Sequence, residues 1–232
     1  MREVLRAGRG ELFGLMLSVV IPALDAAVTL GPCLESVGEV PDVVVVDSGS
    51  RDATREIAVA AGARVVDAPR GRGVQLAAGA EAARGDWLLF LHADTRLSAG
   101  WRDVAEDHMQ RRDVAGCFRF RLDDPAWQAR AIERGVALRV KLLALPYGDQ
   151  GLLVSRRLYD DVGGFRPVPL MEDVGLVRRI GRGRLVVLSA DAVTSAERWR
   201  RDGWARRSTR NLACLALHRM GMSEEKVARI YG

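Results

Sequence analysis

The chain has 232 residues, of which 48% are hydrophobic and 28% charged, and this excludes an intrinsically disordered protein. The formal charge of +5 at pH 7 favours partners that carry phosphate or other anionic groups. No run of residues approaches the roughly 20 apolar residues of a membrane-spanning helix. The three cysteines, Cys33, Cys117 and Cys214, form no CxxC pair, which favours a reducing cytoplasm.

The first half of the chain alternates strands and helices. Short apolar, β-branched segments predict buried strands at 17–21, 42–46, 63–66 and 86–91. The segments between them predict helices at 29–37, 53–61 and 74–83. This alternation predicts an α/β fold with a central, mostly parallel sheet and helices on both faces.

The two remaining parts of the chain are less regular. Residues 1–15 show no strand or helix pattern, and we expect a disordered N-terminal extension there. Beyond residue 98, the patterns predict helices at 101–111, 127–145, 156–162, 171–180 and 204–220. They predict strands at 115–122 and 185–188, and a loop entering a strand at 148–154. No repeat or linker interrupts the chain, so residues 16–232 are expected to form one domain.

Polar side chains follow several of the predicted strands. Asp25, Asp47, Arg70 and Asp94 each come just after a strand. Ligands of parallel α/β sheets bind beyond the carboxyl ends of the strands. The pattern therefore predicts one binding site at this edge.

Three segments together resemble the family 2 glycosyltransferases, which have the GT-A, Rossmann-like fold. They are Ser-Val-Val-Ile-Pro-Ala-Leu-Asp at 18–25, Val-Val-Val-Asp-Ser-Gly-Ser-Arg-Asp-Ala-Thr at 44–54, and Gly-Asp-Trp-Leu-Leu-Phe-Leu-His-Ala-Asp-Thr at 85–95. The chain looks similar to small bacterial members with a His-Ala-Asp metal motif. The resemblance makes 16–97 the nucleotide-binding half and 98–232 the acceptor half.

The resemblance implies transfer of a sugar from a nucleotide-diphosphate sugar, expected to be a UDP-sugar, with inversion at the anomeric carbon. A divalent cation would stabilise the departing diphosphate and would need hard oxygen ligands. We expect Mn²⁺ or Mg²⁺ on Asp94, with His92 where the family usually has a second acid. The alternative for this motif is a helix cap after a strand.

The donor site is expected to combine the strand ends with a basic glycine turn. Asp47 would contact the ribose or base, and Arg70-Gly-Arg-Gly73 would contact the diphosphate through Arg forks and a helix N-terminus. An exposed basic loop is the alternative for the turn. The expected donor-binding residues are Pro22, Asp25, Asp47, Arg70, Arg72, Gln75, His92, Ala93, Asp94 and Arg198.

The acid pair Glu172-Asp173 opens a predicted helix, and both are expected to be catalytic residues. The resemblance assigns the general base to Asp173. The alternative is that acids stabilise a helix N-terminus. Asp149, Gln150 and Trp199 are expected to bind the acceptor, although 148–151 is equally typical of a tight turn.

The arginine-rich stretch 198–210 has two interpretations. It is either a surface for peripheral contact with the inner membrane face, near a lipid-like acceptor, or a solvated helix face. The acceptor itself is expected to be either a lipid-like compound or a small molecule. Nucleic acid is not an expected partner, because no recognised binding module surrounds the stretch.

Two other functions remain open from the sequence. A nucleotidyltransferase would need a glycine-rich loop after the first strand, where this chain has Pro22-Ala-Leu-Asp25. A catalytically degenerate nucleotide-binding module is consistent with Ala26, Ser48 and His92, which stand where the family commonly has acids.

Overall fold

A computed structural model of the chain describes residues 15–168, 171–220, 222–224, 226 and 230. The extension predicted at 1–15 lies outside the described residues except for Leu15, which is partly buried against the core. Within the described residues, no helix combines the length and apolar character needed to cross a bilayer.

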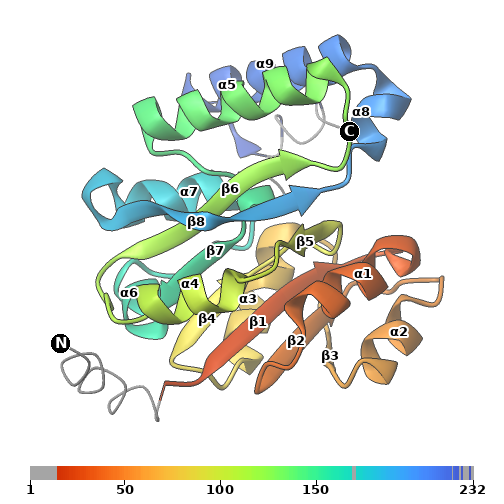
Figure 1. The fold of residues 1–232 in the computed structure, drawn as a ribbon, viewed down its shortest axis with the longest axis vertical. Helices are drawn as coiled ribbons and strands as arrows, with labels where there is room; N and C mark the ends of the chain where they lie inside the picture. Colours follow the sequence, from red (N-terminus) through yellow and green to blue (C-terminus); the bar gives the residue numbers. More distant parts are fainter. Residues whose placement is uncertain (1–14, 169–170, 221, 225, 227–229, 231–232) are drawn as a thin grey trace, which may run out of the picture.

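Eight strands form one mixed sheet in the order β3-β2-β1-β4-β7-β6-β8-β5 (Figure 1). Strands β3, β2, β1 and β4 are parallel, β7 is antiparallel to β4 and β6, β6 and β8 are parallel, and β5 is antiparallel to β8. The predicted α/β architecture with a mostly parallel sheet is therefore confirmed. The strands are β1 (Leu17–Ala23), β2 (Asp42–Asp47), β3 (Arg64–Asp67), β4 (Trp87–Phe90), β5 (Thr95–Leu97), β6 (Ala115–Leu122), β7 (Leu152–Ser155) and β8 (Leu185–Thr194).

The central strands are covered on both faces, which explains their continuous apolar sequences. Successive side chains of a strand point to opposite faces. Val19 and Ile21 pack in the core on one face and Val20 in the core on the other, and all three are fully buried. A run of β-branched residues suits such a strand because neither face meets water.

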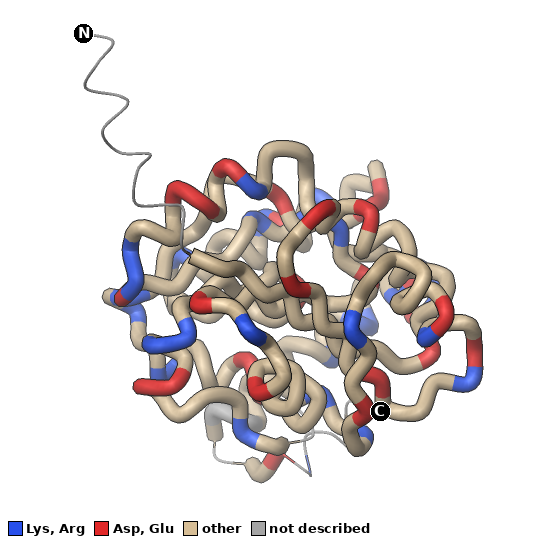
Figure 2. Tube along the Cα trace, turned by 90° about the horizontal axis from the view of Figure 1, so that it is seen from below, with Lys and Arg blue, Asp and Glu red and all other residues tan. Residues whose placement is uncertain are grey.

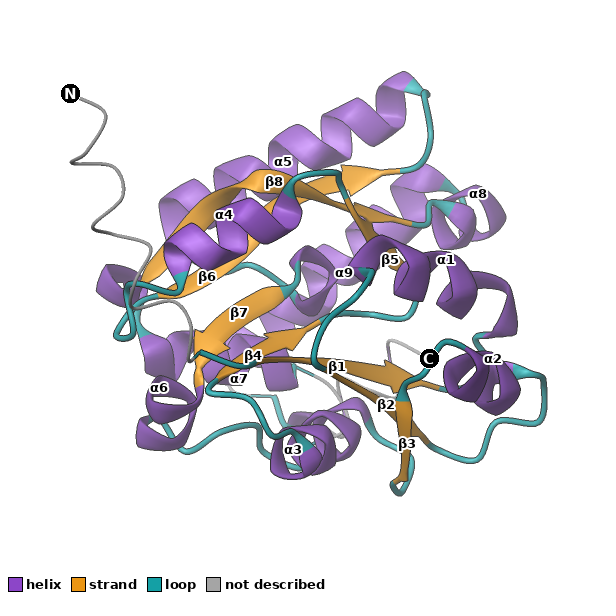
Figure 3. Ribbon diagram, turned by 60° about the horizontal axis from the view of Figure 1, so that its bottom comes forward, coloured by secondary structure: helices purple, strands orange, loops and turns teal. Residues whose placement is uncertain are grey.

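Helices cover the sheet from both sides (Figures 1 and 3). Helices α1, α2 and α4 share a core with one face through residues such as Leu30 and Trp101. Helices α3, α6 and α7 share a core with the other face through Leu76 and Leu176. The helices are α1 (Ala27–Val37), α2 (Thr54–Ala60), α3 (Arg72–Ala82), α4 (Trp101–His108), α5 (Trp127–Leu143), α6 (Arg156–Asp161), α7 (Glu172–Ile180), α8 (Glu197–Asp202) and α9 (Trp204–Arg219), with 3₁₀ turns η2 (Gly148–Gln150) and η3 (Arg182–Arg184).

Helix α3 lies unusually close to the sheet because of one glycine. A Cβ added at Gly79 would come within 2.3 Å of Cγ1 of Val20 and 2.8 Å of Cγ2 of Val46. Only a residue without a side chain allows this approach. The close packing fixes the N-terminus of α3, and with it Arg72, at the carboxyl edge of β1 and β2.

Two elements, strand β5 and helix α8, were not expected from the sequence. Both lie beside this carboxyl edge of the sheet. Strand β5 is only three residues long and pairs with the end of β8, which continues beyond the predicted 185–188. The hydroxyls of Thr95 and Thr194 are 2.8 Å apart in a buried hydrogen bond. The Ser195 amide donates to the Asp94 carbonyl at 3.0 Å, so α8 begins next to the His-Ala-Asp segment.

Basic and acidic residues alternate along much of the chain trace (Figure 2). The formal charge of +5 is therefore not concentrated in one segment. The net charge alone therefore does not locate an anion-binding site.

Candidate active site

Two adjoining pockets open at the carboxyl ends of β1 and β4. The first, here called the α7 pocket, is lined by Asp149, Asp173, Trp199, Arg207 and Asn211, among others. The second, the α1 pocket, is lined by Pro22, Asp25, Thr29, Gln75 and Ala93, among others. The residues common to both are Arg72, His92, Asp94, Ser195 and Arg198.

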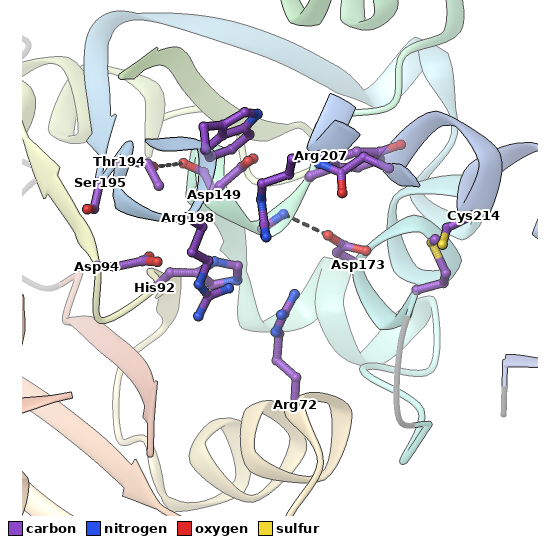
Figure 4. Close-up of a pocket in the computed structure, with 15 residues that line it drawn as sticks. Arg72, His92, Asp94, Asp149, Asp173, Thr194, Ser195, Arg198, Arg207 and Cys214 are labelled. Atoms are coloured by element: carbon purple, nitrogen blue, oxygen red, sulfur yellow. Dashed lines mark hydrogen bonds between the residues drawn. The ribbon is translucent and has the colours of Figure 1, made fainter. Parts of the chain in front are cut away.

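Asp94 and Asp173 face the α7 pocket from opposite sides (Figure 4). The side chains of Arg72, His92 and Arg198 extend into the space between them. Asp94 follows β4, whereas Asp173 stands in the first turn of α7. The fold thus brings together two acids from distant parts of the chain, with two arginines between them.

The Asp173 carboxylate is held by two backbone amides. Its Oδ2 accepts a hydrogen bond from the Gly148 N–H at 2.8 Å, and its Oδ1 accepts one from the Val174 N–H at 2.7 Å. Met171 precedes the helix in a left-handed conformation, with φ of 64°. These contacts fix the carboxylate against the wall of the pocket.

Glu172, the other acid of the pair, lines neither pocket. It is 2% exposed, and its Oε1 lies 3.5 Å from Nη1 of Arg72. Burial, together with the charge of Asp173, raises the pKa of Glu172 to about 7. The ion pair joins the first turn of α3 to that of α7, so the structure gives Glu172 a contact with Arg72 rather than with a ligand.

The His92 imidazole lies at the centre of the site, and the residue is half-buried. Its Nε2 has no hydrogen-bond partner among the described residues and faces Gly148, where an added Cβ would lie 2.4 Å away. Burial, reinforced by the charges of Arg72 and Arg198, lowers the pKa of His92 to about 3. The ring is therefore neutral at neutral pH.

The fit of a divalent cation depends on Asp94. Its carboxylate lines both pockets and supplies the hard oxygen that Mg²⁺ and Mn²⁺ prefer. Nowhere in the described part of the chain do three or more His, Cys, Asp or Glu residues cluster as a metal site. A cation held here would need further ligands from a bound phosphate. The expectation that His92 is a ligand stays a prediction, and the position of Nε2 against Gly148 does not support it.

Asp25 and Asp47, which follow β1 and β2, were both expected in the donor site, but they lie in different surroundings. Asp25 lines the α1 pocket with φ of 48°, and its Oδ1 accepts from the Arg51 amide at 2.8 Å. Asp47 is 1% exposed and lines neither pocket. Burial alone would raise the pKa of Asp47, but hydrogen bonds, chiefly from Ser50, hold it below its usual value. Asp47 therefore organises its own turn.

The basic glycine turn contributes one arginine to the pockets. Arg72 lines both, whereas Arg70 is exposed and lines neither. Gln75 reaches the α1 pocket, and its Nε2 donates to the carbonyls of Ala23 and Val46, both at 2.9 Å. Gln75 thus ties together the ends of β1 and β2 on which the pocket is built.

The predicted acceptor residues divide between two cavities. Asp149 and Trp199 line the α7 pocket, and burial raises the pKa of Asp149 to about 6. Gln150 instead lines a groove between α5 and β6, and its Nε2 donates to the Phe118 carbonyl at 3.0 Å. The structure therefore brings Asp149, but not Gln150, to the site.

Several residues that line the α7 pocket were not predicted from the sequence. Arg207, Asn211 and Cys214 reach the α7 pocket from α9 at i, i+4 and i+7, the spacing of one helical face. That spacing was a signal within the predicted helix at 204–220, but residue type alone did not distinguish it from a solvated face. The other lining residues of this pocket that were missed are Tyr147, Met171, Thr194 and Ser195.

The model of the family named Glycosyl transferase family 2 matches residues 18–168. Glucosyl-3-phosphoglycerate synthase of Mycolicibacterium paratuberculosis is 39% identical over 106 residues, which are 40% of this chain and 30% of that protein. The aligned part therefore spans less than a third of that relative. The sequence similarity to this relative is therefore limited to part of each chain.

Solved structures of glucosyl-3-phosphoglycerate synthase from Mycobacterium tuberculosis have a similar fold. The complex with Mg²⁺ and UDP has a TM-score of 0.59 at 23% identity, covering 80% of this chain and 73% of that one. The complex with Mn²⁺, UDP-glucose and phosphoglyceric acid has a TM-score of 0.56 at 23% identity, covering 77% and 72%. With the family model matching more than half of its length, this chain belongs to glycosyl transferase family 2.

Proposed function

We propose that this protein transfers a sugar from a UDP-sugar to a hydroxyl group of a small or lipid-like acceptor, with inversion at the anomeric carbon. The observation that carries the proposal is the position of Asp94 and Asp173 on opposite sides of one pocket. Family membership supports glycosyl transfer. The solved relatives contain UDP or UDP-glucose with Mg²⁺ or Mn²⁺, which supports the choice of donor and cation.

The α1 pocket is proposed to hold the nucleotide and the shared region its diphosphate. Arg72 stands in the first turn of α3, so its guanidinium and the helix N-terminus both favour an anion at this point. Arg198 reaches the same region from α8. Pro22, Asp25 and Ala93 line the remainder, where the base and ribose would lie.

Asp94 is proposed to hold Mn²⁺ or Mg²⁺ together with the diphosphate. Such a cation, when bound, neutralises the charge that develops on the leaving diphosphate. The neutral His92 ring, packed against Gly148, would keep the segment carrying Asp94 in place. Because Asp94 is the acid that both pockets share, cation affinity is expected to be weak until the nucleotide contributes its phosphates.

On the other side, Asp173 is proposed to accept the proton of the acceptor hydroxyl. The oxygen would then attack the anomeric carbon from the side opposite the diphosphate, and the configuration inverts. Asp149 and the face of Trp199 line the space in which the acceptor would be held. A cytoplasmic protein, in contact with the inner membrane face where the acceptor is lipid-like, is the proposed setting.

Calorimetric titration with UDP, GDP, CDP and dTDP, each with and without Mn²⁺, tests the proposal. UDP is expected to bind best, and Mn²⁺ to strengthen its binding at least tenfold, an effect of about 1.4 kcal/mol. Asp94→Asn should remove the Mn²⁺ effect, while the control Asp161→Asn on α6 should retain it. Metal-independent binding by the unmodified protein would contradict the role of Asp94. Binding of donor without turnover for any acceptor or water would favour the degenerate binding module.

A further inference from the structure

Helix α5 presents an exposed stripe to solvent. Residues 127, 131, 134, 138, 141 and 142 follow one another at helical spacing and all are exposed. The side chains of Trp127, Leu138 and Leu142 are 75%, 56% and 55% exposed. The α5 stripe, as we call these six residues, combines three large apolar side chains with Ala131, Arg134 and Lys141.

The charges on the α5 stripe are all positive. Glu133, the one acid of α5, is buried and paired with Arg121 at 3.0 Å and Arg130 at 2.8 Å. Before the helix begins, Asp124 is paired with Arg200 at 3.0 Å. An apolar surface with uncompensated basic residues complements the negative charge of anionic lipid headgroups.

The arginine-rich stretch 198–210 is a weaker candidate for this contact than its sequence indicates. Trp199 and Arg207 are buried, and Arg207 donates to Asp202 at 2.9 Å. The same carboxylate also accepts from Arg201 and Arg210, at 2.8 and 2.9 Å. Three arginines of the stretch therefore already form ion pairs within the protein.

The α5 stripe is connected to the α7 pocket through the C-terminal half of the helix. The Arg139 guanidinium lies over the Tyr147 ring, 3.5 Å from its centroid, and its Nε donates to the Leu145 carbonyl at 2.9 Å. Tyr147 lines the α7 pocket. Contact of α5 with a surface would thus bring the acceptor side of the pocket near that surface.

We propose that the α5 stripe docks this protein onto the surface of an anionic lipid bilayer. Trp127 lies among the headgroups, Leu138 and Leu142 enter the boundary with the acyl chains, and Arg134 and Lys141 meet lipid phosphates. A second copy of the chain is a poorer occupant, because its own α5 stripe would bring only positive charges to the interface. The docking does not depend on the proposed transfer reaction.

Co-sedimentation with vesicles tests the proposal. The unmodified protein is expected to sediment with vesicles of phosphatidylcholine and phosphatidylglycerol, but not with phosphatidylcholine alone, and to be released by salt. Arg134→Gln combined with Lys141→Gln should weaken binding roughly 30-fold, the effect of two basic residues at such a surface. Trp127→Ser, Leu138→Ser and Leu142→Ser together should abolish it.

A control changes one exposed apolar residue and one exposed basic residue elsewhere. Val59→Ser on α2 with Arg157→Gln on α6 alters side chains that are 64% and 72% exposed, and should leave vesicle binding unchanged. Circular dichroism melts establish that every variant is folded. Absence of vesicle binding by the unmodified protein, or equal binding by the α5 variants, overturns the proposal. So does a dimer in light scattering that the serine substitutions dissociate without any vesicle binding.

Discussion

The Gly148 amide donates a 2.8 Å hydrogen bond to Oδ2 of Asp173, and so joins the 3₁₀ turn before β7 to the first turn of α7. Gly148 also packs against His92, since a Cβ at this position would lie 2.4 Å from Nε2. One residue thus sets the distance between the end of β4 and the start of α7. The two acids of the proposed mechanism are held apart by this packing.

Gly148→Ala is expected to damage the site more than the fold. The added methyl group must displace the His92 ring, and the amide held by Asp173 moves with it. Misplacement of about 1 Å lowers turnover up to about 100-fold. Steady-state kinetics measures the effect. Gly135→Ala on α5, where nothing lies within 4 Å of the added Cβ, is the control and should retain full activity.

Asp173→Asn is expected to bind UDP normally and to lose turnover. An amide cannot accept the proton of the acceptor hydroxyl, and general-base catalysis contributes roughly 10²- to 10⁴-fold. Donor binding is followed by calorimetry and turnover by release of UDP. Asp161→Asn, an exposed acid on α6, should behave as the unmodified protein in both assays. Near-normal turnover of Asp173→Asn would remove the proposed base.

Glu172 is expected to make the stability of the protein depend on pH. Its pKa is raised to about 7 in the folded protein, mainly by burial, so folding favours the protonated form. This stabilisation is complete below the unfolded value near 4.5 and is lost as the pH rises through about 7. Asp149, whose pKa burial raises to about 6, acts in the same direction.

Glu172→Gln tests this assignment. The variant should lose less free energy of unfolding than the unmodified protein between pH 5 and pH 8, as measured by urea titrations on a pH series. Glu56→Gln, an exposed residue of α2, should leave the original pH dependence in place. The same pH dependence in Glu172→Gln as in the unmodified protein would show that Glu172 does not cause it.

The first half of the fold could be predicted because its strands are buried on both faces. Runs such as 43–46 contain only valine, and few structures other than a covered strand accommodate them. Once the strands were located, Asp25 and Asp94 followed at their carboxyl ends, and the structure places both in the pockets. Strand β5 could not be predicted, because it is held by a bond between Thr95 and Thr194, 99 residues away.

Neighbouring polar residues lie in different surroundings, which no local pattern could predict. Asp173 enters the α7 pocket, whereas Glu172 is buried beside Arg72. Asp149 lines the same pocket, whereas Gln150 lines a separate groove between α5 and β6. Consecutive side chains leave the backbone in different directions, and long-range packing decides which direction leads to a cavity.

The amino-acid sequence by itself determined the order of strands and helices and the chemistry available at the strand ends, since both depend on local patterns of burial and on residue type. Only the tertiary structure decided which of those groups share a cavity. In the folded protein, Asp47 and Glu172 make internal contacts instead of lining the pockets, and Arg207 of α9 lines the α7 pocket. The physical reason is that a site is defined by distances between side chains far apart in the chain, and packing of whole elements sets those distances.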